Sequence, residues 1–141
     1  MTVYTFPGEP VPKGRPRSTR SGHTYTPVRT KRAEDAIRWE LKAQGAKPTS
    51  EPVQVALYFH CKSQTADLDN LIKLVLDAAN GYLYDDDRQV YRIVAEIERG
   101  ASEPETRLAV SSINTRYKRT RHEHLRRITE LGQEIESGAA A

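Results

Sequence analysis

Aspartates are concentrated in one short stretch of the sequence, residues 67–90, DLDNLIKLVLDAANGYLYDDDRQV. Asp67 and Asp69 open the stretch, and three consecutive aspartates at positions 85–87 lie near its end. The stretch holds six acidic and two basic residues, a balance of −4 in a chain whose net charge is +3. Crowded carboxylates repel one another, so a fold that gathers them needs cations. Mg²⁺ or Mn²⁺ is the usual partner of carboxylate oxygens.

The spacing within this stretch is suited to phosphodiester hydrolysis. Residues two apart in an extended segment point to one side, so Asp67 and Asp69 can face a common ion. Lys73 follows Asp69 by one helical turn, about 6 Å along the axis, within reach of a phosphate bound there. Divalent ions activate water and stabilise the leaving oxygen, and an ammonium offsets charge developing in the transition state. We therefore expect Asp67, Asp69 and the later aspartates to form one two-part metal site.

Each piece of this pattern also has an ordinary structural explanation. An aspartate at a helix start is commonly a cap, aspartates are common in turns, and a helix lysine is normally solvated. The alternative to a metal site is therefore a capped helix followed by an acidic turn.

Two basic segments flank the acidic stretch. Residues 1–32 carry a balance of +6 and residues 116–127 a balance of +5. In the first segment the cations are interleaved with His23 and Tyr25, a combination that suits a phosphate backbone and unpaired bases. Nucleic acid is the commonest partner of such segments, although a solvated loop has a similar composition. The candidate DNA-binding residues are Lys13, Arg15, Arg17, Arg20, Arg29, Lys31 and Arg32.

Hydrophobic periodicity predicts the elements that position these residues. Prolines limit residues 3–12 to a short edge strand, and residues 13–27 form a loop or loose hairpin. Residues 30–45 have helical spacing, with Thr30 as N-cap and Gly45 beyond the C-terminus. Trp39 lies off the apolar stripe, which places it at the margin of the core or in a subunit contact, and the core is the simpler of the two. Residues 53–61 alternate cleanly as a strand, with Cys61 as a small core residue and His60 on the opposite face.

A change to helical period follows the connector at residues 62–66. The predicted helix has an apolar stripe and ends at the Asn-Gly pair 80–81, before a polar turn over residues 82–88. Residues 90–99 and 106–115 predict two strands whose short connection favours an antiparallel pair. Residues 116–137 predict a basic-fronted amphipathic helix, followed by a disordered end. The apolar stripe of residues 67–79 is Leu68, Leu71, Ile72, Val75, Ala78 and Ala79.

Length and composition exclude several classes of protein. A chain of 141 residues is one domain by the usual prior. Its single cysteine excludes an internal disulfide and fits a reducing compartment. No apolar run approaches a membrane span, and the N-terminus does not resemble a signal peptide. We therefore expect a cytoplasmic protein with no membrane partner and no small-molecule cofactor.

The combination of DLDNLIK with the later DDDRQV resembles the RusA-type Holliday junction resolvases, including phage and prophage members. The similarity extends upstream to PVPKGRPR and GHTYTP and downstream to VYRIVAEIER, about residues 3–115. It implies an α/β (α+β) domain over residues 1–115, with a small mixed sheet of about four strands and helices packed on it. Residues 116–141 form a separate basic helix and tail beyond the family core.

The resemblance also implies an activity and a set of site residues. It implies a homodimer that cuts four-way DNA junctions with Mg²⁺ or Mn²⁺ by paired symmetric nicks. The catalytic aspartates fall on Asp67, Asp69 and Asp87, with Asp86 as a neighbouring ligand, and the essential lysine falls on Lys73. The extra Asp85 leaves open which member of the triplet binds metal.

Two other functions remain compatible with the sequence. One is a nucleic-acid-binding or packaging-associated protein whose aspartates are only structural. The other is a metal-dependent nuclease that acts on flaps, forks or RNA.

Overall fold

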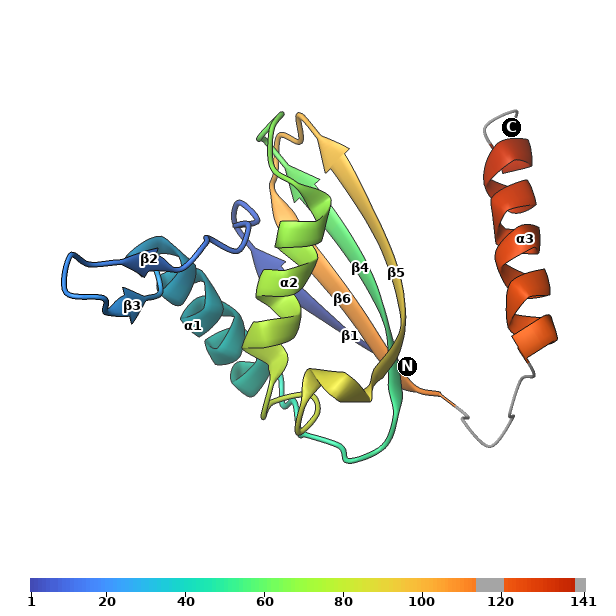
Figure 1. The fold of residues 1–141 in the computed structure, drawn as a ribbon, viewed down its shortest axis with the longest axis horizontal. Helices are drawn as coiled ribbons and strands as arrows, with labels where there is room; N and C mark the ends of the chain where they lie inside the picture. Colours follow the sequence, from blue (N-terminus) through green and yellow to red (C-terminus); the bar gives the residue numbers. More distant parts are fainter. Residues whose placement is uncertain (114–120, 139–141) are drawn as a thin grey trace.

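The structure is a computed structural model that describes residues 1–113 and 121–138, and Figure 1 shows its elements. The N-terminal part contains β1 (Thr2–Pro7), the short strands β2 (Arg17–Ser18) and β3 (Thr24–Tyr25), and helix α1 (Val28–Ala43). The central part contains β4 (Val53–Cys61), helix α2 (Leu68–Ala79) and the 3₁₀ turn η1 (Asp87–Gln89). Strands β5 (Val90–Arg99) and β6 (Glu105–Ser112) and helix α3 (Arg121–Gly138) follow.

A mixed four-stranded sheet in the order β1-β6-β4-β5 forms the frame of the molecule. Strand β4 pairs parallel with β5, with Val55 opposite Ile93, and antiparallel with β6. The predicted antiparallel pairing of residues 90–99 with 106–115 is therefore wrong. The connection after β5 crosses the end of β4, where the Ala101 N–H donates to the Cys61 carbonyl at 2.9 Å. The apolar alternation of β4 explains this order, because the most buried strand takes a partner on both sides.

Helices α1 and α2 pack together on one face of this sheet (Figure 1). The alternate residues of β4 point to these helices and are buried, as the alternation predicted. Leu71, Val75, Ala78 and Ala79 of the predicted α2 stripe are buried as well, and Leu74 joins them. The opposite face of the sheet carries half-buried Tyr58 and His60. The predicted α+β class, with a small mixed sheet and packed helices, is confirmed.

Three local predictions are corrected by the structure. Thr30 is not an N-cap: α1 begins two residues earlier, after Pro27, whose fixed φ suits a helix entrance. Thr30 is instead buried, and its hydroxyl accepts a hydrogen bond from the Gly14 N–H at 3.0 Å. Trp39 is 69% exposed and lies outside the core. The turn after α2 is not wholly polar, because Leu83 and Tyr84 are buried beneath it.

Helix α3 forms most of the predicted C-terminal helix and includes Gly138, the first residue of the predicted disordered end at 138–141. Residues 116–120 and 139–141 lie outside the described residues. Its apolar residues are exposed, and Figure 1 shows the helix standing apart from the sheet. No helix among residues 1–113 and 121–138 is long and apolar enough to span a membrane. The stripe of α3 consists of Leu125, Ile128, Leu131 and Ile135.

Candidate active site

The junction between β4 and α2 presents the first two aspartates to solvent. Asp67 is the N-cap residue of α2 in extended conformation, and both Asp67 and Asp69 are exposed. The Asp67 side chain does not cap the described helix α2; its carboxylate accepts a 3.4 Å hydrogen bond from the Asn70 side-chain amide. Neither Asp67 nor Asp69 forms an ion pair with any described residue. The capping alternative is therefore not what the structure shows for Asp67.

Several hydrogen bonds hold this junction in place. The Glu9 carboxylate accepts from the backbone N–H groups of Lys62, at 2.9 Å, and Ser63, at 3.1 Å. At the other side, the Arg99 guanidinium donates to the Ala66 carbonyl at 2.8 Å. Glu9, which follows β1, thus holds the start of the connector after β4, and Arg99 of β5 holds the residue that precedes Asp67.

A cavity of about 530 Å³ lies directly against Asp67. Asp67 and Asn70 form part of its wall. Its cationic residues are Lys13, Arg15 and Arg17 from the segment between β1 and α1 (the basic loop) and Arg29 from the first turn of α1. A polyanion in this cavity meets guanidinium groups beside a carboxylate, which is the composition expected where a phosphate backbone passes a metal-binding group.

Close packing of the basic loop against α1 shapes this cavity. A Cβ atom at Gly14 would lie only 2.6 Å from the Thr30 hydroxyl oxygen, so only glycine fits there without a shift. The buried Thr30 therefore fixes the distance between the loop at Gly14 and helix α1. Arg20, Lys31 and Arg32 are exposed, at the hairpin and on the first turns of α1.

Lys13 is held by acidic side chains rather than open to solvent. Its ammonium pairs with Glu34 of α1 and, at 3.1 Å, with Asp77 of α2. Burial by itself lowers the pKa of Lys13, but the hydrogen bonds and charges of Glu34 and Asp77 outweigh it and raise the pKa above its usual value. Lys73 lies 3.6 Å from the same Asp77 carboxylate. The structure therefore places the Lys73 ammonium beside the carboxylate of Asp77, which lies one helical turn further along α2.

The acidic turn at positions 85–87 lies beyond the other end of α2. The Asp86 carboxylate caps η1: it accepts from the Arg88 N–H at 2.9 Å and from the Arg88 guanidinium at 3.0 Å. The backbone hydrogen bond from Arg88, followed by its side chain, lowers the Asp86 pKa. Asp85 is exposed and Asp87 half-buried. Asp86 thus already has a structural role. The carboxylates of Asp85 and Asp87 have fewer hydrogen bonds to described residues than that of Asp86.

Buried Tyr84 shows how much negative charge this end of α2 carries. Its hydroxyl donates to the Leu76 carbonyl at 2.8 Å. Burial raises the Tyr84 pKa, and the charges of Asp87, Asp77 and Asp86 raise it further. The negative charge of these three carboxylates is therefore felt by a buried hydroxyl near the C-terminal end of α2.

The two groups of predicted ligands lie at opposite ends of α2. The helix has twelve residues, about 18 Å at 1.5 Å per residue. Figure 1 shows the connection from β4 at one end of α2 and the yellow turn η1 at the other. Among residues 1–113 and 121–138, no three Asp, Glu, His or Cys side chains lie close enough to hold a metal ion. That the two groups share one metal site stays a prediction.

Sequence reasoning missed the contacts of Asp77 and Glu34. The sequence patterns assigned no role to Asp77 or to Glu34. Two signals were available: Asp77 follows Lys73 by four residues, and Glu34 interrupts the buried side of α1 between Thr30 and Ile37.

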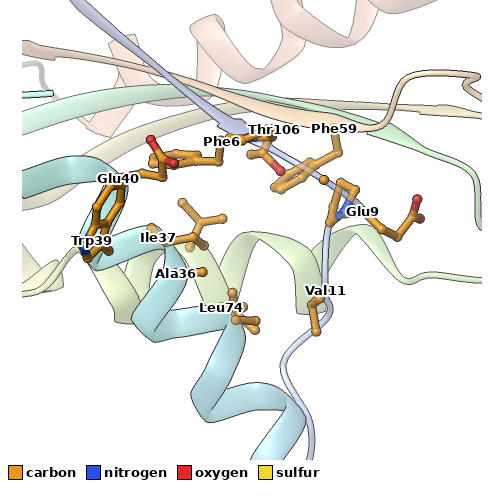
Figure 2. A pocket seen from close by; sticks show the side chains of 15 residues that line it. Phe6, Glu9, Val11, Ala36, Ile37, Trp39, Glu40, Phe59, Leu74 and Thr106 are labelled. Atoms are coloured by element: carbon orange, nitrogen blue, oxygen red, sulfur yellow. The ribbon is translucent and has the colours of Figure 1, made fainter. Parts of the chain in front are cut away.

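A second cavity, of about 390 Å³, is apolar and lies between β1 and α1 (Figure 2). Phe6, Ile37 and Phe59 contribute to its walls, and Trp39 stands at its edge. The candidate metal-binding and DNA-binding residues do not line it. It adjoins the cavity beside Asp67 at Glu9 and Pro10, which line both.

The sequence matches the model of a known protein family. The model of the endodeoxyribonuclease RusA family matches residues 7–111, most of the chain. The chain belongs to the RusA endodeoxyribonuclease family. The matched residues include both groups of aspartates, Lys73 and the basic loop, whereas α3 lies beyond them. Membership in the RusA family makes the chain a nuclease whose partner is junction DNA. A search of curated proteins gave no match.

Proposed function

We propose that this protein is a divalent-metal-dependent endodeoxyribonuclease that resolves four-way DNA junctions by paired symmetric nicks. The observation that carries the proposal is the shared cavity of Asp67 with Arg15, Arg17 and Arg29 in a chain of the RusA family. A nuclease needs this combination, because guanidinium groups bind the phosphate backbone while carboxylates serve the reaction.

The donor chemistry of the site fits Mg²⁺ or Mn²⁺. Asp67 and Asp69 are exposed, and their carboxylates form no ion pair with the described residues, so both remain able to bind a hard cation. Asp87 is the third proposed ligand, with Asp86 as its neighbour. A bound ion would activate water and stabilise the leaving oxygen. The arginines orient the strand, and Lys73 offsets charge on the phosphate being cut.

A homodimer is supported by the separation of the two aspartate groups. One protomer places Asp67 and Asp87 at opposite ends of α2, so a second copy in the reverse direction would bring the partner's Asp87 toward Asp67. Strand β5 is an open edge that follows η1 and ends at Arg99, which binds Ala66. Antiparallel contact of two β5 strands would therefore bring these ends together. The edge exposes Tyr91, Ile93 and Val94, which suits burial in such a contact.

Cleavage of a synthetic four-way junction tests the activity. The purified protein is incubated with labelled junction, fork, flap, duplex and RNA substrates at one salt concentration, with Mg²⁺, Mn²⁺ or EDTA. We expect metal-dependent nicks in two strands of like polarity on the junction. Preferential cutting of forks, flaps or RNA would replace the proposed substrate, and absence of metal-dependent nicks on every substrate would remove the activity.

Mixing two inactive variants tests the shared site. In heterodimers of Asp69→Asn with Asp87→Asn, one composite site carries both changes and the other carries neither. Cutting should therefore return on mixing, as single nicks and at no more than about half the wild-type rate. If each site lay within one protomer, both sites of the heterodimer would remain defective and mixing would restore nothing.

A further inference from the structure

Four charged side chains form a continuous chain from α1 to the exposed side of α2. Glu34 pairs with Lys13, Lys13 pairs with Asp77 at 3.1 Å, and Asp77 lies 3.6 Å from Lys73. Exposure of the side chains rises in that order, from 10% for Glu34 through 21% and 23% to 63% for Lys73. The chain thus links a buried carboxylate of α1 to a lysine that is free to meet DNA.

Asp77 is placed by Lys13 more firmly than by Lys73. The Lys13 ammonium is closer, is better shielded from water and has a second anchor in Glu34. Glu34 is itself held on its other oxygen by Arg38 at 3.3 Å. Charges act more strongly on one another where water is excluded, so the Lys13–Asp77 ion pair is the stronger of the two contacts of Asp77. The contact between Asp77 and the solvated Lys73 is the weaker one.

The backbone of Lys13 adds a second connection to α2. Its N–H donates to the Asn70 carbonyl at 2.9 Å, in the first turn of the helix. The next residue, Gly14, is bound to Thr30. Lys13 therefore has its main chain on one turn of α2 and its ammonium two turns further along, with little freedom to turn toward a phosphate.

We propose that Lys13 is a positioning residue of the nuclease reaction, which holds Asp77 so that Asp77 in turn directs Lys73 at the phosphate being cut. This inference rests on the proposed function. It replaces the expectation, based on charge alone, that Lys13 is a DNA contact like Arg15 and Arg17. Lys13 lines the cavity beside Asp67 as the arginines do, but its ammonium is paired with Glu34 of α1 and Asp77 of α2. These two ion pairs separate Lys13 from Arg15 and Arg17.

Lys13→Met tests this role when binding and cutting are measured separately. We expect the single-turnover rate at saturating junction to fall about tenfold or more, because Asp77 no longer holds the Lys73 ammonium toward the phosphate. The junction Kd should stay within about twofold, and the slope of log K against log salt should not change. A DNA contact would do the reverse: binding would weaken, and the slope would become shallower by about 0.9 with the saturated rate unchanged.

A second background separates positioning from general structural damage. In Lys73→Ala the directed group is absent, so adding Lys13→Met should change the residual rate by less than about twofold. Lys13→Met combined with Glu34→Gln removes the carboxylate left without its lysine. This double variant should recover thermal stability without recovering the rate. The matched control is Lys42→Met, an exposed lysine in the last turn of α1, which should keep both rate and Kd.

Three results would overturn the inference: a wild-type rate in folded Lys13→Met, an equal further loss in the Lys73→Ala background, or recovery of the rate together with stability. Each of these leaves the proposed function intact, since the wild-type protein still cuts the junction. Absence of cutting by the wild-type protein would instead remove the proposed function, and this inference with it.

Discussion

The side-chain amide of Gln89 ties the acidic turn to the loop before β4, because it donates to the Thr49 carbonyl at 2.7 Å. The same amide nitrogen lies 3.0 Å from the Glu51 carbonyl, and the amide oxygen accepts from the Asp86 N–H at 2.9 Å. Gln89 therefore satisfies three backbone groups that no strand or helix serves. Through these hydrogen bonds Gln89 fixes the position of the turn that carries Asp87.

Replacing Gln89 with leucine should destabilise the protein. Each lost hydrogen bond is worth about 1 kcal/mol, so we expect the free energy of unfolding to fall by about 2–3 kcal/mol. Urea titration of wild type and variant measures this change. Gln54→Leu is the control, because the Gln54 amide donates to the Ser111 hydroxyl at 3.1 Å. Loss of this one hydrogen bond should cost about 1 kcal/mol or less. Equal losses in the two variants would show that Gln89 is not a special anchor.

Arg15, Arg17 and Arg29 should contribute to DNA binding rather than to the chemical step. Changing any one to glutamine should weaken junction binding and make the log–log salt slope shallower by about 0.9, as for one phosphate contact. The rate at saturating junction should stay close to that of wild type. Fluorescence anisotropy between 50 and 200 mM salt gives the slope. Arg92→Gln, on the face of the sheet opposite α2, should leave the slope unchanged.

Asp67→Asn, Asp69→Asn and Asp87→Asn should each abolish cutting while junction binding stays equal or becomes tighter. Removing one negative charge reduces repulsion of the phosphate backbone, while the amide is a poorer ligand for a hard cation. Cleavage and anisotropy on the same preparations measure both effects. Asp35→Asn, an exposed aspartate of α1, serves as the control with unchanged cutting. Normal cutting by Asp69→Asn would remove that residue from the proposed ligands.

Stability at alkaline pH should depend on Lys13. Its pKa in the folded protein is raised above the ordinary 10.5, so the folded state holds this proton more tightly than the unfolded chain. The contribution of Lys13 is fully present below pH 10.5 and is lost as pH rises through the folded pKa. The difference in unfolding free energy between wild type and Lys13→Met should therefore shrink above pH 10.5. A difference that stayed constant up to that pKa and beyond it would contradict this linkage.

Local patterns predicted most of the elements and failed where distant parts of the chain compete. The alternation over residues 53–61 predicted β4 with its bounds, because a strand buried on one face requires that pattern. The pairing of β5 was wrong, because a short connection favours a hairpin but does not reveal that β4 offers two free edges. Trp39 was misplaced for a similar reason, since helical spacing does not say which margin of a helix the sheet covers.

The sequence alone predicted the chemistry: carboxylates at Asp67, Asp69 and in the triplet at positions 85–87, a lysine one turn beyond the first pair, and arginines ahead of them. Residue type and spacing along a helix are local properties, and they are enough to indicate phosphate chemistry. Only the tertiary structure decided that Lys13 is enclosed by Glu34 and Asp77, that Asp86 caps a turn, and that α2 separates the two aspartate groups. Those facts depend on how α1, α2 and the sheet pack together, and packing joins residues whose distance along the chain carries no record of the contact.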